Sequence, residues 1–420
     1  MTQDNPDPPD GGIAARLGRL PILRNPAFRL ADYRRFWAGA GLNQLGTSGE
    51  QVVLGLLVFQ ITESSAWVGA LMAVYFLPMF VFGLLSGAVS DWMDRRQLLR
   101  RVELCIVANS CALAAMIAAG FVELWLILSF ALLAGCFRAL HHPTRFSYAY
   151  DIVGGNQVVA GLGLLNLGSR FGQLIGALVS GFVMERVGAP AAILTLAACH
   201  GGAFFLFCRL ETAGEAAEKV RAPIVQNVRE YLSELKTNRV LLMLVLVTAS
   251  VEVFGFSFAT ALPELATVRF SLGAEGLGMM HAARSIGGII AGLTLSGMGS
   301  MTRRGVAYIF VIFAFGSGLI LLSVADHLIL AVIALCIVAA LATASDVLTQ
   351  SMVQLSVPNA LRGRAMGAWT LAIGSAPLGH LEMGALAVAI GIGHALLVNG
   401  TMLILVGIVV FFAAPRLRSL

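Results

Sequence analysis

Apolar residues form long runs along nearly the whole chain, and short polar segments separate them. A bilayer core about 30 Å thick is crossed by a helix of about 20 apolar residues, and twelve runs have approximately this length. They are 36–61, 67–90, 102–120, 123–142, 157–184, 189–208, 239–263, 273–298, 305–325, 327–351, 365–390 and 393–414. The pattern predicts an all-α membrane protein with twelve transmembrane helices in two six-helix bundles.

The polar segments also predict how the chain is divided. A polar tail (1–35) precedes a six-helix bundle (36–208), and a linker (209–238) leads to a second bundle (239–414) and a short tail (415–420). Within the linker, Ile224, Val228 and Leu232 recur at helical spacing with charged residues between them, which predicts an amphipathic helix at the membrane surface. The N-terminal tail has no apolar core, so we expect no cleavable signal peptide.

Composition agrees with the membrane class. Hydrophobic residues make up 58% of the chain and charged residues 12%, whereas soluble domains carry about 25% charged residues. The net charge of +5 does not indicate nucleic-acid binding, because the basic residues stand in short clusters between apolar runs. The six cysteines lie inside or at the ends of these runs, which argues against a disulfide framework or a metal site. We expect a monomer without a cofactor.

The basic clusters predict the orientation in the bilayer. If the twelve runs are spans, 24 Lys and Arg residues lie on the side of the two termini and only Arg186 and Arg269 lie on the other side. Arg170 and Arg284 fall within spans. Basic loops face the cytoplasm, so we expect a multi-pass protein of the inner membrane with both termini cytoplasmic.

Two short patterns recur in both halves. Gly161, Leu165 and Gly168-Ser169 of the fifth span have the spacing of Gly367, Leu371 and Gly374-Ser375 of the eleventh. Arg95-Arg96 after the second span likewise corresponds to Arg303-Arg304 after the eighth. Transporters are often built from such repeats, with the substrate site between them.

The junction after the second span carries the most specific motif, Gly87-Ala-Val-Ser-Asp91-Trp-Met-Asp94-Arg95-Arg96. It resembles the loop signature of the major facilitator superfamily, with Trp92 in place of a basic residue and Asp94 in place of a glycine. With an aspartate before the arginine pair, the motif resembles that of the branch of enterobactin-exporter-like proteins and other secretion permeases. A charge cluster where a helix leaves the membrane can hold two halves of a transporter together, so we expect Gly87, Asp91, Asp94, Arg95 and Arg96 to form a gate.

Further segments resemble the same branch and cover nearly the whole chain. They are Asp32-Tyr-Arg-Arg-Phe-Trp37, Pro78, His142-Pro143-Thr-Arg145, Val357-Pro358-Asn-Ala-Leu-Arg362-Gly-Arg364 and Pro377-Leu-Gly379. The resemblance implies a cavity lined mainly by the first, fourth, seventh and tenth spans. Gly168, Gly172 and Gly176 of the fifth span partly resemble the antiporter signature of exporters, although Gln173 stands where that signature has proline. In any case, this spacing predicts close helix packing.

Polar side chains inside the spans are the candidates for the cavity and for coupling, because ionisable residues at this depth are costly unless they face a cavity or a partner. Six are acids or arginines, and each has polar neighbours at helical spacing, which predicts water-facing walls. The candidates are Asn43, Thr47, Glu50, Asn166, Arg170, Gln173, Glu252, His281, Arg284, Asp346 and Glu382. For His141-His142 we expect a role at the end of a helix and no metal.

Glu50 and Glu252 lie near the middle of corresponding spans in the two halves, and Arg170 and Arg284 lie near the same depth. A buried carboxyl group can take up a proton when an arginine moves away from it, so we expect Glu50 to couple transport to protons. These residues favour a proton-coupled exporter of a small molecule such as a siderophore or drug. The alternatives are an importer of the same fold, a polytopic membrane enzyme and a non-transporting sensor. An enzyme usually places paired acids, histidines or a nucleophile in loops, and the outer loops here are short.

Overall fold

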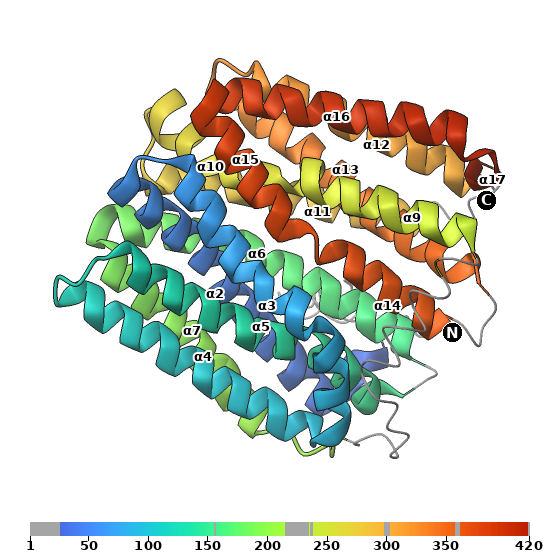
Figure 1. The fold of residues 1–420 in the computed structure, drawn as a ribbon. Helices are drawn as coiled ribbons and strands as arrows, with labels where there is room; N and C mark the ends of the chain where they lie inside the picture. The colour runs from blue at the N-terminus through green and yellow to red at the C-terminus, as the bar shows by residue number, and fades with distance from the viewer. Residues whose placement is uncertain are drawn as a thin grey trace, which may run out of the picture.

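The structure, a computed structural model, describes residues 26–154, 157–214, 235, 238–297, 303–357 and 362–418. The helices form two groups that lie side by side, with the two termini at the same end (Figure 1). The predicted amphipathic helix of the linker lies outside the described residues. The twelve-helix fold predicted from the apolar runs is confirmed, and every predicted run overlaps a helical segment.

The first bundle follows a short 3-10 helix, η1 (Pro26–Arg29). Its helices are α2 (Ala31–Thr62), α3 (Ser65–Trp92), α4 (Arg95–Ala118), α5 (Leu124–Val153), α6 (Val158–Val187) and α7 (Ala189–Cys208). The second bundle begins with α9 (Arg239–Ser250) and continues through η2 (Val251–Gly255), η3 (Phe256–Ala261), α10 (Leu262–Glu264) and η4 (Leu265–Arg269). It ends with α11 (Ala274–Gly297), α12 (Arg304–Ser323), α13 (Leu328–Leu355), α14 (Arg362–Ile373), α15 (Ala376–Ile390), α16 (Ile392–Ala413) and the short α17 (Pro415–Arg418).

Within the described ranges, nine helical segments are long and apolar enough to cross a membrane by length and composition. The two tandem patterns of the sequence behave differently. Both arginine pairs stand at the start of a helix, Arg95-Arg96 at α4 and Arg303-Arg304 at α12. The glycine pattern, however, lies in a continuous α6 in the first half and at a break between α14 and α15 in the second. Pro377 stands in the first turn of α15, where a proline is tolerated because an amide hydrogen at that position would have no acceptor within the helix.

The seventh span is the most irregular. The segment from Arg239 to Arg269 passes from α-helix through a π-helical turn at Val251–Gly255 and a 3-10 stretch at Phe256–Ala261 to a second π-helical turn at Leu265–Arg269. Such π-turns interrupt the regular ladder and are frequent at functional sites. Glu252 lies in the first of them.

Close helix packing at the glycines of α6 is confirmed. A Cβ atom at Gly172 would overlap the carbonyl oxygen of Gly41 on α2, and one at Gly176 would overlap that of Leu45. These two helices form the most extensive helix pair of the molecule as described. Within a membrane, where apolar lipid competes with apolar side chains, small residues stabilise a helix pair by letting the backbones approach.

Four glycines also bring the two bundles together, at the end of the molecule away from the termini. Gly69 of α3 and Gly384 of α15 form one contact, and Gly181 of α6 and Gly278 of α11 form the other. At each of them a Cβ atom would lie too close to the backbone of the other bundle. We call these two contacts the glycine seam.

Two hydrogen bonds close this end of the molecule. The Ser65 hydroxyl donates to the carboxylate of Glu264, and Glu185 accepts the backbone amide of Ala274 at 2.6 Å. Glu185 therefore places a negative charge at the start of α11, where the helix dipole favours it.

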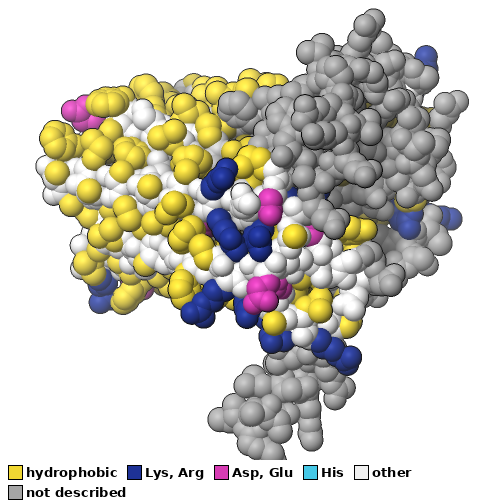
Figure 2. Space-filling model, turned by 90° about the horizontal axis from the view of Figure 1, so that it is seen from below, with side chains coloured by type: hydrophobic (Ala, Val, Ile, Leu, Met, Phe, Trp, Pro, Cys, Tyr) yellow, Lys and Arg dark blue, Asp and Glu magenta, His cyan; other side chains and the backbone are white. Residues whose placement is uncertain are grey.

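The outer surface is apolar, as a lipid-facing surface must be. Figure 2 views the molecule from below, and hydrophobic side chains cover the left part of that face. Lys and Arg side chains, with several Asp and Glu, gather from the middle to the right. Large apolar side chains such as Trp125, Phe182 and Phe412 are at least half exposed, which is expected of residues that contact lipid.

Candidate functional site

A buried carboxylate that the sequence did not single out organises the first bundle. Glu103 of α4 is 0% exposed. The amide nitrogen of Asn43 donates to its two oxygens at 3.2 and 2.9 Å, and Nδ1 of His200 lies 2.7 Å from Oε1. Nε2 of His141 lies 3.5 Å from Oε2. We call Asn43, Glu103, His141 and His200 the Glu103 cluster. Asn43 therefore faces this cluster, and it also lines the small cavity beside Glu50.

Space for the cluster is created by a glycine. A Cβ atom at Gly46 would overlap the His200 ring, so α2 leaves room for the imidazole to reach Glu103. An ionised carboxylate only accepts hydrogen bonds, and the orientation of His200 directs one ring nitrogen at it. Carboxylates that are this deeply buried are retained only when they are paired and hydrogen-bonded.

Glu50 lies beside this cluster. Its carboxylate is 8% exposed and accepts a hydrogen bond from the Ser110 hydroxyl at 3.2 Å. The charges that act on it belong to His200, Glu103 and Arg138. The arginine expected near Glu50 is therefore Arg138 of α5 and not Arg170 or Arg284, because the face of α2 that carries Glu50 turns into its own bundle.

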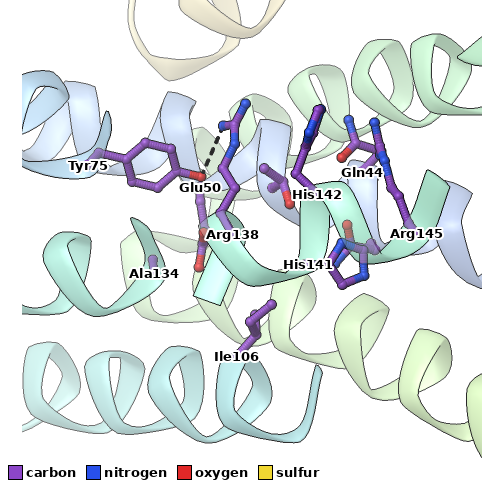
Figure 3. Close-up of a pocket in the computed structure, with 11 residues that line it drawn as sticks. Gln44, Glu50, Tyr75, Ile106, Ala134, Arg138, His141, His142 and Arg145 are labelled. Carbon is purple, nitrogen blue, oxygen red and sulfur yellow. Dashed lines mark hydrogen bonds between the residues drawn. The ribbon is translucent and has the colours of Figure 1, made fainter. Parts of the chain in front are cut away.

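A small cavity opens next to Glu50 (Figure 3). It holds about 20 Å³, which is room for one water molecule. Arg138 donates to the Tyr75 hydroxyl at 3.5 Å and lies over that ring. In Figure 3 the side chains of Arg138, His142 and Arg145 point away from Ile106 of α4, whereas His141 points toward it. The full lining is Asn43, Gln44, Thr47, Glu50, Tyr75, Ile106, Ala134, Arg138, His141, His142 and Arg145.

The expected position of His141-His142 at a helix end is wrong. Helix α5 continues to Val153, so both histidines lie within it. For the same reason Arg138 and Arg145 are inside a helix and not in a cytoplasmic loop, and Arg145 is 5% exposed. Without these two, 22 of the 24 basic residues that the sequence assigns to the side of the termini are left, so the predicted charge bias persists.

Arginines from both bundles meet near the interface between the halves. Arg170 of α6 donates to the Thr343 hydroxyl of α13 at 3.3 Å, which crosses from the first bundle to the second. Arg284 of α11 donates to Nδ1 of His281 at 3.2 Å and lies over the Phe258 ring. Because a guanidinium can only donate, this nitrogen of His281 must accept, and His281 is neutral here.

Two acids of the second bundle, Glu252 and Asp346, form a separate group. Glu252 of η2 is 7% exposed and interacts electrostatically with Asp346 of α13, which in turn attracts Arg170. Glu382 of α15 pairs with the amide of Asn399 at 3.1 Å. Arg170, Glu252 and Asp346 are thus brought together, while Glu50 and Glu382 lie elsewhere. Of the other candidates, Asn166 is exposed and Gln173 is half-buried.

Among the described residues, the arginines of the motif after the second span contact α5 and the start of the linker. Arg95 pairs with Asp151 at the end of α5 at 2.7 Å, and Arg96 donates to the backbone oxygen of Glu211 at 2.9 Å. The side chain of Asp91, and the environment of Gly87, lie outside the described residues. The gate role of this motif therefore stays a prediction.

Asp94 has a local role that explains its departure from the signature. Its carboxylate accepts the backbone amides of Arg96 at 2.8 Å and Gln97 at 3.2 Å, so it caps the start of α4. Replacing such a cap by alanine costs about 1 kcal/mol, and replacing it by glycine costs only a few tenths. We expect Asp94→Ala to lower the melting temperature of the purified protein more than Asp94→Gly does. Equal melting of Asp94→Ala and the wild type would mean that the cap is not stabilising.

Comparisons with known proteins agree with this architecture. The family model described as "Transmembrane secretion effector" matches residues 23–419. The staphyloferrin A transporter of Staphylococcus aureus is 22% identical over 391 residues, covering 91% of this chain and 96% of that protein. The enterobactin exporter EntS of Shigella flexneri is 25% identical over 410 residues, covering 93% of this chain and 94% of that protein.

Solved structures show the same fold at lower identity. A peptide transporter POT in complex with sulfate superposes with a TM-score of 0.76 at 14% identity, covering 93% of this chain and 95% of that chain. The nucleoside transporter NupG gives a TM-score of 0.72 at 14% identity, with coverage of 91% and 98%. The family match over nearly the whole length, on a twelve-helix fold with charged side chains buried between its halves, leads to one conclusion: this chain is a membrane transporter that belongs to the transmembrane secretion effector branch of the major facilitator superfamily.

Proposed function

We propose that this protein is a secondary active transporter that exports a small molecule from the cytoplasm by alternating access, in exchange for protons. The observation that carries the proposal is a set of ionisable side chains within helices of both bundles. Glu50 and Glu252 are buried, and Arg170, Arg284 and Asp346 are half-buried. Such groups are expensive in a membrane and mark pathways of substrates and protons. The direction is supported by the relatives described as enterobactin exporters.

Alternating access needs two arrangements of the bundles, and the glycine seam is compatible with one of them. With 22 basic residues assigned by the sequence to the side of the termini, the positive-inside rule puts that side in the cytoplasm. The seam then lies at the outer end, and the state described is closed to the outside. A cysteine introduced at Phe270 should react with a membrane-impermeant reagent from outside intact cells, and protection there would overturn this orientation. In this arrangement the motif from Gly87 to Arg96 would act as the gate when the inner ends approach.

Proton coupling is assigned to Glu50. Its carboxylate is buried beside Arg138 and next to a cavity that has room for a water molecule. A buried carboxyl group is neutral when its cation moves away and ionised when the cation returns. Movement of Arg138 with α5 would therefore change the proton affinity of Glu50 during the cycle.

The test is Glu50→Gln in proteoliposomes, with a compound selected by its melting shift on the purified protein. We expect the variant to bind the compound and exchange it across the membrane, but its flux should no longer respond to an imposed pH difference. Glu123→Gln, at an exposed position before α5, is the matched control and should respond as the wild type does. If Glu50→Gln also responds like the wild type, Glu50 is not the coupling site, and Glu252 and Asp346 are the next candidates. Absence of any protein-dependent flux would contradict the transporter proposal itself.

A further inference from the structure

Three arginines form a line across the interface between the bundles. Arg145 of α5 and Arg170 of α6 belong to the first bundle, and Arg284 of α11 belongs to the second. Arg145 reaches Ser169, the residue before Arg170, and Arg170 reaches Gly288, one helical turn after Arg284. Arg138 and Arg170 repel Arg145, and Arg170 repels Arg284. We call Arg145, Arg170 and Arg284 the arginine line. Like charges that are held together in a low-dielectric interior repel strongly, so the line requires a compensating group.

The described part of the chain does not supply that group at contact distance. The ion pairs found among the described residues involve other side chains. Asp346 attracts Arg170 but is not in an ion pair with it among the described residues, whereas the charges that act most on Arg145 and Arg284 are those of other arginines. The acidic groups of the first bundle are engaged elsewhere, Glu103 with His200 and Glu50 with Ser110.

The neutral partners leave much of the donor capacity of the line unused. Arg145 is 5% exposed, reaches the Ser169 hydroxyl at 3.4 Å, and its Nε is buried without a hydrogen-bond partner in the part of the chain that is described. Arg170 and Arg284 each make one side-chain hydrogen bond to a described residue, Thr343 and His281 respectively. A guanidinium has five N–H donors, and a planar fork of this kind matches a carboxylate or a phosphate.

The backbone of α11 leaves room for Arg170, the middle residue of the arginine line. A Cβ atom at Gly288 of α11 would lie 2.9 Å from Nη1 of Arg170. The second bundle therefore leaves space for a guanidinium that comes from the first. Helices α6 and α11 pack closely along this path, so Arg170 is held between the two bundles.

We propose that the arginine line binds an anionic group, a carboxylate or a phosphate, of the transported molecule. This inference rests on the proposed transport function and names the class of its substrate. Since the line draws on both bundles, a bound anion contacts both of them at once. A change in their arrangement separates Arg284 from Arg145, so the affinity for the anion differs between the two states, as transport requires.

The binding experiment uses the full-length protein in a non-ionic detergent at constant ionic strength. The probes are citrate, succinate, benzoate and inorganic phosphate, with tetraphenylphosphonium as a lipophilic cation and chloride as the reference. We expect the anions, and citrate most, to raise the melting temperature with a saturable dependence, and the cation to leave it unchanged. The proposal is wrong if none of the four anions raises the melting temperature more than chloride does, or if the cation raises it instead.

Substitutions locate the binding. Loss of one charge-assisted contact weakens binding by about tenfold or more, so Arg284→Gln should raise the dissociation constant by at least that factor. Arg284→Lys keeps the charge and should lie between this variant and the wild type. Arg186→Gln, at an exposed arginine that stacks on Phe182, is the control and should bind as the wild type does. An unchanged constant in Arg284→Gln and Arg145→Gln would overturn the assignment even if anions bind.

Two further measurements distinguish a transported anion from a bound lipid headgroup. Phosphatidylglycerol added to the detergent tests whether the line prefers a lipid, and stabilisation by this lipid alone would contradict a soluble substrate. Counterflow of the bound anion in proteoliposomes tests transport independently. Anion binding without counterflow would support the binding site and contradict the transport function. Counterflow of a neutral or cationic compound without anion binding would support the transport function and contradict the anion site.

Discussion

Leucine at position 176 is expected to prevent the first bundle from assembling. A Cβ atom at Gly176 would already overlap the carbonyl oxygen of Leu45, and the atom in the way is backbone that cannot rotate aside. Overpacking of a tight contact costs about 1–3 kcal/mol for small additions, so Gly176→Ala should melt at a clearly lower temperature than the wild type. The isobutyl group of Gly176→Leu requires α2 and α6 to separate, and we expect no folded, monodisperse protein on size-exclusion chromatography in detergent.

A glycine on the same helix provides the control. Gly163 is exposed, and a Cβ atom there would have no neighbour within 4 Å. Alanine is the better helix former by about 1 kcal/mol, so Gly163→Ala should melt at the wild-type temperature or slightly above it. Equal melting of the Gly176→Ala and Gly163→Ala variants would show that the close approach of α2 and α6 is not required for stability.

Removal of the carboxylate of Glu103 is the second change with a large expected effect. It is 0% exposed and receives donors from Asn43 and His200. Breaking a buried pair by removing one partner costs about 3–5 kcal/mol, because the remaining polar groups stay buried without a partner. Glu103→Ala should therefore strongly lower the free energy of unfolding, and Glu103→Gln, which keeps an acceptor, should lower it less.

A double-mutant cycle attributes the loss to the pair with His200. We expect Glu103→Ala and His200→Ala each to destabilise the protein, and the double variant to lose less than their sum, since both remove the same interaction. Thermal unfolding in detergent gives all four values. Strict additivity would mean that the 2.7 Å contact between Glu103 and His200 contributes no coupling energy and that the cluster acts only through packing.

The twelve helices can be predicted from the sequence because the bilayer imposes a length of about 20 apolar residues on each span. Helix ends are less accessible. The arginines and the proline near His142 predict that the fourth span ends there, but α5 continues to Val153. A single proline does not end a helix whose neighbours satisfy the freed backbone group, and Pro143 is such a residue. Arg138 and Arg145 therefore belong to the helix and not to the predicted loop.

Which polar residues meet can be predicted only in part. Helical spacing shows that Asn43 and Glu50 share a face of α2, but not which neighbouring helix that face contacts. Glu103 stands next to the predicted start of its span, and His200 stands among small apolar residues. Ser110 shares a face of α4 with Glu103, but His200 has no polar neighbour at helical spacing. A buried glutamate on α4 and a buried histidine on α7 are the available signal, since each is costly in lipid without a partner. Their contact depends on the rotation of two helices that are far apart in the sequence.

The glycine seam has a consequence for the speed of the transport cycle. Interlocked side chains must leave their rotamers before two surfaces part, and this raises the activation enthalpy of opening. At Gly69, Gly181, Gly278 and Gly384 the bundles meet through backbone, so a rocking motion there leaves the rotamers unchanged. The local barrier then comes from the two hydrogen bonds of Glu264 and Glu185 and from the stacking of Phe76 on His380. The outer end of this transporter should therefore open with a low activation enthalpy, so that the rate of opening depends only weakly on temperature.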